Sequence, residues 1–286
     1  MRQAEMTDAV WTTLLALRAD ARTQPSPDWE PGVRAAWDLY APIADGGGAA
    51  PYTFAQVGQS LDGRIATLSG DATEVSGPAG LRHLHRCRAL ADAVLVGVRT
   101  ALLDDPRLTV RLVEGPSPAR VVIDPRGRLP NDAAALRSDG ARRLVVQSVA
   151  KQRPPGVEVI ALPAADGWIS PAAIRAALAE RGLRRLLIEG GGVTIAGFLD
   201  AGLLDRLHVG IAPLIIGAGP TGLRAAPVPR LADALRPETH VYGLDTDVIF
   251  DCALRPGGSA STSTWPTVTE PAPLEARRAR VQGAAS

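Results

Sequence analysis

The sequence predicts an α/β fold: a mostly parallel mixed sheet covered by helices, with antiparallel strands near its C-terminal end. Apolar runs at 94–96 and 186–188 do not alternate with polar residues, which is typical of parallel strands buried on both faces. Helix-like segments lie between such runs. The last strand-like segments alternate more, and 239–254 is long with Asp245 and Asp247 at its centre, which indicates a terminal antiparallel pair.

Composition excludes several classes of function. The 286 residues include 31 basic and 30 acidic side chains, and this balance argues against a nucleic-acid or membrane-surface partner. No apolar run approaches the roughly 18 residues of a membrane helix, and no signal-peptide core is present, so we expect a soluble cytoplasmic protein. Cys87 and Cys252 are expected to be buried apolar fillers rather than a disulfide.

Three zones follow one another along the chain. Residues 1–50 form a helical extension, with helices expected at 8–20 and 31–40 and a flexible joint at 45–48. Its three tryptophans are expected to dock it onto the main domain, and a lid over the active site is the alternative. Residues 51–255 form the main α/β domain. Residues 256–286 are Ser-, Pro- and Ala-rich and are expected to be a disordered tail.

The main domain alternates strands and helices. Strands are predicted at 52–57, 93–98, 120–124, 144–147, 158–162, 185–189, 206–216 and 239–254, the last with an internal turn. Helices are predicted at 78–91, 171–181 and 194–201. Ser170 before Pro171 is a suitable helix start, and Gly182 is a suitable stop.

Two polar turns follow predicted strands, where ligands bind in open α/β sheets. The first, Gly58 to Gly63, contains Asp62 and is a weak signal by itself. The second contains Asp104 and Asp105 before a proline, which places them in a loop, and it is followed by Arg107 and Arg111. The arginines suit a phosphate. A solvated loop with local ion pairs is the alternative interpretation.

A glycine-rich turn joins the strand at 185–189 to the next helix. It begins at Glu189 and continues as Gly190, Gly191 and Gly192 before Thr194. Backbone amides at such a helix start can hold a pyrophosphate, and glycine allows its close approach. The turn is neither a G-x-G-x-x-G fingerprint nor a P-loop. Tight packing without a ligand would produce the same pattern.

The three segments in this order resemble the reductase domain of bifunctional riboflavin-biosynthesis deaminase/reductases and of stand-alone pyrimidine reductases. The resemblance runs from about Pro51 to Leu254. Its hallmarks here are Ser60-Leu61-Asp62-Gly63, Ser76-Gly77-Pro78, Arg86-Cys87-Arg88-Ala89, Asp104-Asp105-Pro106-Arg107-Leu108-Thr109, Val122-Ile123-Asp124, Glu189-Gly190-Gly191-Gly192 and Ile211-Ala212-Pro213-Leu214-Ile215-Ile216-Gly217.

The resemblance implies a homodimeric dihydrofolate-reductase-like enzyme that uses NADPH to reduce the ribosyl side chain of a 5-amino-6-ribosylaminouracil 5′-phosphate-type riboflavin precursor to ribityl. It implies these cofactor-binding residues: Gly58, Thr100, Asp104, Gly190, Gly191, Gly192, Val193, Thr194, Ile195 and Ala196. It implies substrate contacts from Arg88, Leu108, Arg111 and Glu189. The choice between NADPH and NADH depends on a group near the adenosine 2′-phosphate, and Arg126 and Ser148, just beyond two predicted strands, are the candidates; the sequence does not decide between the two cofactors.

The chemistry needs a proton donor but no nucleophile, because the hydride comes from the cofactor. Asp62, Asp104 and Glu189 are the candidates, and the sequence does not choose among them. Glu189 could equally serve as a carboxylate that only hydrogen-bonds the substrate.

The chain departs from the family pattern at three positions. Ala72 and Glu74 replace a serine and an aromatic residue, and Pro125 replaces a small hydroxyl residue. These changes leave two alternatives open: a reductase of a different small heterocycle in a side pathway, or a non-catalytic NADPH-binding paralogue.

No metal site and no deaminase activity are expected. A deaminase needs a zinc site of histidine and paired cysteines with a catalytic glutamate. The four histidines, His83, His85, His208 and His240, form no such pattern. His83 and His85 are two residues apart on a predicted helix and so face different ways.

Overall fold

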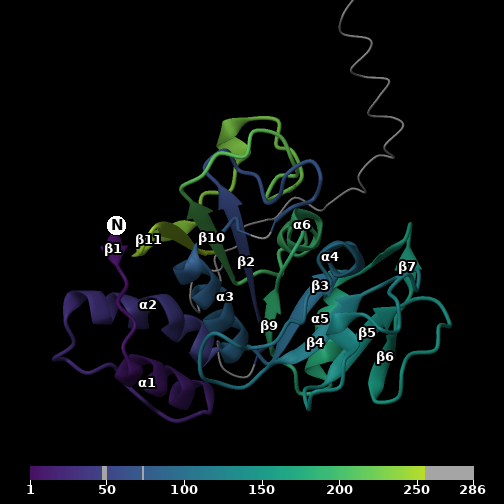
Figure 1. Cartoon of the computed structure of the whole chain (residues 1–286), viewed down its shortest axis with the longest axis horizontal. Helices are drawn as coiled ribbons and strands as arrows, with labels where there is room; N and C mark the ends of the chain where they lie inside the picture. The colour runs from purple at the N-terminus through teal and green to yellow at the C-terminus, as the bar shows by residue number, and fades with distance from the viewer. Residues whose placement is uncertain (47–49, 73, 255–286) are drawn as a thin grey trace, which may run out of the picture.

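The computed structural model describes residues 1–46, 50–72 and 74–254. The predicted disordered tail, and Gly47 and Gly48 of the predicted joint, lie outside these ranges. Ten strands form one sheet in the order β1-β11-β12-β10-β2-β9-β3-β4-β5-β6 (Figure 1). The strands are β1 (Arg2–Gln3), β2 (Tyr52–Ser60), β3 (Ala93–Gly97), β4 (Ala119–Ile123), β5 (Arg143–Gln147), β6 (Val157–Ala161), β9 (Arg185–Ile188), β10 (Arg206–Ala212), β11 (Glu238–Leu244) and β12 (Asp247–Ala253), and β7 (Ala164–Ala165) and β8 (Trp168–Ile169) form a separate ribbon.

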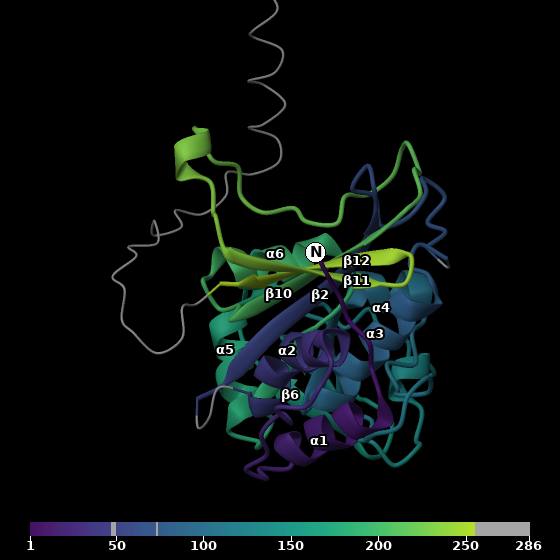
Figure 2. The ribbon, with the colours of Figure 1, turned by 90° about the vertical axis from the view of Figure 1, so that its left-hand side faces the viewer.

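The sheet is mixed, as the sequence predicts. From β10 through β2, β9, β3, β4 and β5 to β6, every neighbouring pair is parallel. β12 is antiparallel to both β10 and β11. Figure 2 shows this antiparallel hairpin beside β10. The turn expected within 239–254 is present at Asp245, which has φ +59°, a value that Asp tolerates better than most residues.

Helices cover both faces of the sheet. They are α1 (Asp8–Arg18), α2 (Pro31–Asp45), α3 (Pro78–Leu90), α4 (Val98–Asp104), α5 (Pro171–Ala179) and α6 (Gly192–Asp200), with short 3-10 turns η1 (Ala134–Leu136) and η2 (Leu231–Asp233). Side chains of α1 to α4 join one apolar cluster, and those of α5 and α6 join the other. β3 lies between them, because Val94 and Val96 face the first cluster and Leu95 faces the second. This explains its unbroken apolar sequence.

The N-terminal helices are packed into the first cluster. Trp11 and Trp37 are each less than one-tenth exposed there, and Tyr40 is 1% exposed. The Arg185 guanidinium donates to the backbone oxygens of Arg18 and Ala44, 2.7 and 2.9 Å away, so it satisfies carbonyls at the C-terminal ends of α1 and α2. The structure therefore agrees with the interpretation that the tryptophans dock the extension onto the main domain, and not with a lid over the active site.

Two local predictions were wrong. β10 ends at Ala212 rather than at 216, because Pro213 has no amide hydrogen for the ladder. Asp104 is not in a loop: it is the last residue of α4, a helix that the sequence analysis missed, and the chain leaves that helix through Asp105 at φ +37°. Ser170 does precede α5, although its side chain makes no capping hydrogen bond. No helix in the described ranges is long and apolar enough to cross a membrane.

Candidate active site

The predicted site residues gather where parallel strands end. β2, β9 and β3 are neighbours in the sheet and run in the same direction. The turn with Asp62 therefore follows β2, Glu189 and the glycines follow β9, and α4 follows β3, all at the same edge. Such an edge is the usual ligand site of parallel α/β sheets.

The turns after β9 and β3 contact each other directly. The Gly191 amide donates to Thr100 Oγ1 at 3.0 Å. A Cβ added to Gly190, which has φ +84°, would lie 2.7 Å from the Thr100 methyl carbon, so only glycine fits there. Thr194 lies against the start of α4 in return, because a Cβ at Gly97 would be 2.6 Å from its Oγ1. The structure thus brings the predicted cofactor residues of α4 and α6 together.

The other predicted cofactor residues on α6 and β2 fall into three groups. Gly192 and Val193 open α6, where the first backbone amides have no partner within the helix. Ile195 and Ala196 are buried in the core or nearly so, which leaves them only backbone groups to offer. Gly58 lies on β2, and a Cβ there would be 2.6 Å from Ser76 Oγ, so this glycine makes room for the loop before α3.

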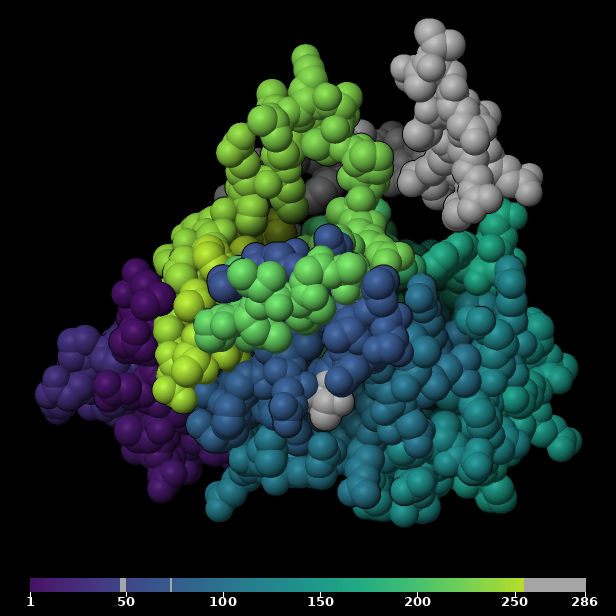
Figure 3. All heavy atoms as spheres, turned by 45° about the horizontal axis from the view of Figure 1, so that its top comes forward, coloured from purple at the N-terminus to yellow at the C-terminus, as the bar shows by residue number. Residues whose placement is uncertain are grey.

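A segment after β10 lies across this edge of the sheet. In Figure 3 it is the green chain against the blue loop that follows β2. The Leu61 amide donates to the Leu214 carbonyl at 2.9 Å, and the Gly222 amide donates to that of Gly63 at 3.1 Å. A Cβ at Gly192 would lie 2.4 Å from the Gly222 oxygen, so the same segment also passes close to the start of α6.

Asp62 holds that segment in place. Its carboxylate accepts hydrogen bonds from Ser60 Oγ at 2.6 Å and from the amides of Ile216 and Gly217 at 3.1 and 2.7 Å. These hydrogen bonds, with that from Ser60 the strongest cause, lower the pKa of Asp62 to about 2. A group that is ionised at neutral pH is a poor proton donor, so the structure argues against Asp62 in that role.

Arg88 and Glu189 are paired with each other. Arg88 Nε and Nη2 donate to the two carboxylate oxygens of Glu189 at 2.8 and 2.7 Å, and both residues are buried. Arg88 Nη1 also donates to the Thr109 carbonyl at 3.1 Å. The pair therefore connects α3, the loop after α4 and the end of β9. Neither charge is free for a phosphate or a proton transfer while this pair is intact.

Arg111 is the more available cation. It is exposed, and its guanidinium Nη1 donates to Thr109 Oγ1 at 2.9 Å. Partial burial, and the nearby charges of Arg88 and Arg107, lower the pKa of Arg111, which shows that this guanidinium lies in a field of like charge. Leu108, between these arginines, is buried with φ +56° and shapes the loop.

His85 is a residue of this site that the sequence analysis missed. Its Nδ1 accepts a hydrogen bond from the Arg111 amide at 2.9 Å, and the Leu112 amide lies 3.4 Å away. Burial, and then the charges of Arg88 and Arg111, lower the pKa of His85 to about 4, so it is neutral and able to accept. No local pattern reveals this contact, which joins residues 26 apart.

Asp104 differs from the other two carboxylates. The residue is exposed at the end of α4, yet partial burial of its carboxyl raises its pKa. Its neighbour Asp105 instead accepts from the Ala134 amide at 2.7 Å and holds the chain after β4. Burial thus shifts the protonation equilibrium of Asp104 toward the acid form, in the opposite direction to that of Asp62.

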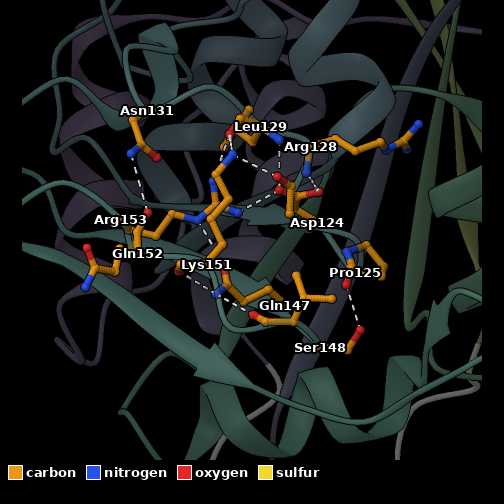
Figure 4. Close-up of polar contacts among 12 residues, drawn as sticks. Asp124, Pro125, Arg128, Leu129, Asn131, Gln147, Ser148, Lys151, Gln152 and Arg153 are labelled. Carbon is orange, nitrogen blue, oxygen red and sulfur yellow. Dashed lines mark hydrogen bonds and ion pairs between the residues drawn. The ribbon is translucent and has the colours of Figure 1, made fainter.

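The loops after β4 and β5 are held by a buried ion pair (Figure 4). Asp124 accepts from the amides of Arg128 and Leu129 at 2.8 and 2.9 Å and from Arg153 Nη2 at 2.6 Å. Ser148 Oγ donates to the Pro125 carbonyl at 2.6 Å, so its hydroxyl hydrogen is engaged. Figure 4 shows the Arg128 side chain extending away from this network, and Arg126 is also exposed.

The substituted loop before α3 is open to solvent. Ala72 and Glu74 are both exposed, and Thr73 lies outside the described residues. The described part of this loop thus makes no interior contact that would explain either departure from the family pattern.

Comparison with known proteins identifies relatives across most of the chain. The model of the RibD C-terminal domain matches residues 51–245. The 2,5-diamino-6-ribosylamino-4(3H)-pyrimidinone 5′-phosphate reductase of Methanothermobacter thermautotrophicus is 35% identical over 219 residues, which cover 72% of this chain and 99% of the relative. The enzyme of the same name from Archaeoglobus fulgidus is 35% identical over 180 residues, covering 58% of this chain and 82% of the relative.

Solved structures extend the likeness to the fold. The deaminase/5-amino-6-(5-phosphoribosylamino)uracil reductase of Thermotoga maritima superposes with a TM-score of 0.63 at 24% identity, over 84% of this chain and 74% of that one. This likeness and the observed strand order confirm the predicted fold class.

Proposed function

The chain belongs to the RibD C-terminal domain family, and on that premise we propose that it is an NADPH-dependent reductase of a ribosylaminopyrimidine 5′-phosphate. The reaction reduces the ribosyl side chain to ribityl. The two archaeal relatives are named for the 2,5-diaminopyrimidinone, which favours this substrate over the deaminated uracil form.

One observation supports the cofactor: the contact between the turns after β9 and β3. The amides of Gly192 and Val193 open the first turn of α6, and Thr100 packs against Gly190 beside them. Backbone amides at a helix start, with the positive end of its dipole, suit a pyrophosphate. The residues present therefore fit a dinucleotide, which would supply the hydride when bound.

The loop containing Arg111 supports a phosphorylated substrate. The Arg111 guanidinium is exposed and lies near the positive charges of Arg88 and Arg107, and a bound phosphate would offset the repulsion among them. His85 and the Arg88–Glu189 pair fix the backbone on which Arg111 is carried, from either side. They are positioning residues, because they act on the substrate through the loop.

The reaction needs a proton donor because one bond of the sugar ring breaks. When hydride is added to C1′, the bond from C1′ to the ring oxygen breaks, and that oxygen needs a proton to become the ribityl hydroxyl. We assign this donation to Asp104, since its raised pKa favours the protonated carboxyl. Asp62 keeps its charge and orders the segment after β10.

The preference for NADPH over NADH is assigned to the loops after β4 and β5. Arg126 and Arg128 are exposed there and lie on a loop made rigid by Asp124. A fixed guanidinium suits the 2′-phosphate that distinguishes the two cofactors. Ser148 is a weaker candidate, because its hydroxyl hydrogen is already donated to Pro125.

Turnover measurements test the proposal. The full chain is mixed with NADPH or NADH and with each form of the pyrimidine phosphate, diamino or deaminated, and cofactor oxidation is followed. We expect turnover with NADPH and the diamino form. Arg111→Gln should raise the KM for substrate by about 10- to 100-fold, the effect of losing a charge-assisted hydrogen bond. Arg22→Gln, an exposed arginine on the extension, is the matched control.

The exposed Ala72 and Glu74 favour one other candidate, a non-catalytic NADPH-binding protein. It predicts that NADPH binds but that neither pyrimidine is reduced, and this result would replace the reductase assignment. NADPH that fails to bind would contradict both.

We also propose that the protein is a cytoplasmic homodimer. Ile215, Val228, Leu231 and Leu235 expose large apolar side chains on the segment between β10 and β11, and a second copy would cover them. Sedimentation at two protein concentrations tests this, and a monomer at both would contradict it.

A further inference from the structure

Three side chains that bind metals in proteins meet in the interior. His83 and Cys87 lie four residues apart on α3, and therefore on the same face of the helix, and His208 comes from β10. One ligand atom from each lies within 4.8 Å of the other two, and all three residues are buried. None of them belongs to the proposed cofactor or substrate site.

Two of the three separations between ligand atoms are close to those of atoms that share an ion. His83 Nε2 is 3.3 Å from His208 Nδ1 and 3.7 Å from Cys87 Sγ. In a tetrahedral zinc site with Zn–N of about 2.0–2.1 Å and Zn–S of about 2.3 Å, neighbouring ligand atoms are about 3.4 Å (N to N) and about 3.6 Å (N to S) apart. A hydrogen bond between two nitrogens would be expected nearer to about 3.0 Å.

The outward ring nitrogens have partners of the kind that support metal ligands. Tyr40 Oη, from α2, lies 2.7 Å from His83 Nδ1. Asp251, on β12, places a carboxylate oxygen 3.2 Å from His208 Nε2, although outside hydrogen-bond geometry. Asp251 is in turn held by two 2.7 Å contacts from Arg206. A histidine ligand usually has a carboxylate or another oxygen at its second nitrogen, which fixes the tautomer and the ring.

We propose that His83, Cys87 and His208 form a binding site for a zinc ion. A nitrogen, nitrogen and sulfur donor set suits zinc, and three protein ligands leave a fourth position for water. Binding replaces the Cys87 thiol proton with a bond from sulfur to zinc, and the proton is released to solvent. The ion would join α3 to β10, with Tyr40 bringing the N-terminal extension into the same assembly.

Metal content tests the proposal independently of reductase activity. The full chain is produced in zinc-supplemented medium, dialysed against metal-free buffer and measured by mass spectrometry of the metal. We expect about one zinc ion per chain. Cys87→Ser and His208→Gln should lose it. Cys252→Ser and His240→Gln change the same residue types outside the group and should keep it. Zinc that is absent from the wild type, or equal in the wild type and Cys87→Ser, would overturn the proposal.

Two further measurements keep the test valid if a ligand variant does not fold. Loading the wild type with Co²⁺ alone should give the absorption of a thiolate–cobalt bond, and its absence in the folded, cobalt-treated protein contradicts a site that includes Cys87. Tyr40→Phe keeps the ring but removes the oxygen at His83, and should weaken zinc binding by about 10- to 100-fold. Unchanged zinc affinity would exclude the supporting role of Tyr40.

Discussion

Helix α3 contributes side chains to two polar regions, one in the interior and one at the strand ends, and the two regions differ in how far their charges are paired. Toward the interior it directs His83 and Cys87, whose polar atoms face other protein atoms. Toward the strand ends it directs His85 and Arg88, which hold the loop that carries Arg111. Beside His83 and His208, the buried carboxylate of Asp251 is paired with Arg206, whereas at the strand ends Arg111 and Asp104 are exposed. The difference indicates where a charged ligand can be accommodated: beside groups that the fold holds in place but does not neutralise.

The largest expected effect comes from breaking the buried ion pair between Arg88 and Glu189. Arg88→Ala leaves Glu189 buried without its cation, which should cost about 3–5 kcal/mol of unfolding free energy. Arg142→Ala breaks an exposed pair with Glu158 and should cost less than about 1 kcal/mol. Urea unfolding of both variants measures the difference. Equal losses would mean that burial does not distinguish the two pairs.

Substitution of the exposed Asp104 should have the opposite consequences, a large fall in kcat and little change in the free energy of unfolding. Asp104→Asn removes the proposed proton donor and should lower kcat by about 100-fold or more, with an unchanged urea midpoint. Asp105→Asn retains an acceptor for the Ala134 amide and should leave kcat nearly unchanged. The donor must be protonated, so the wild-type kcat should fall as pH rises through the raised pKa of Asp104. A kcat that stays level in Asp104→Asn would move the role to another group.

Substitution of Gly192, in the glycine-rich turn, should have an effect of intermediate size on stability and on NADPH binding. In Gly192→Ala the new methyl would meet the Gly222 carbonyl at 2.4 Å, and this overpacking should cost about 1–3 kcal/mol and weaken NADPH binding. Gly197→Ala, in the same helix, has its nearest neighbour at 4.0 Å and should be neutral or stabilising. Calorimetric titration with NADPH and thermal unfolding separate the two variants. Equal behaviour would argue that the segment after β10 can move away.

The parts of this picture that the sequence could predict are local. Unbroken apolar runs located β3 and β9, and the glycines located the turn into α6, because burial on both faces and a positive φ each restrict the residue types at one place. Pro213 could have shown that β10 ends early. The four-residue spacing of His83 and Cys87 is also visible in the sequence, but it lacks the paired cysteines of a deaminase zinc site, and the sequence therefore predicts no metal.

Pairings over long separations could not be predicted in this way. Arg88 and Glu189 are 101 residues apart, and the family resemblance implies a substrate contact for each of them separately. Only the fold shows that they neutralise each other. Similarly, His208 reaches His83 across 125 residues. The sequence identified the groups able to meet a ligand, and tertiary contacts decide which of them are already engaged.

The smallest expected effect tests the interior contact that holds the Arg111 loop. Burial keeps the pKa of His85 at about 4, against an ordinary value of 6.5, so the unfolded chain takes up a proton at a pH where the folded chain does not. This histidine therefore gives full stability above pH 6.5, and stability declines as pH falls toward 4. In His85→Asn, where the amide oxygen can accept from the Arg111 amide, urea midpoints should fall less between pH 7 and pH 5 than in the wild type. His240→Asn, an exposed control, should follow the wild type. Parallel curves for all three proteins would show that His85 is not held neutral by burial.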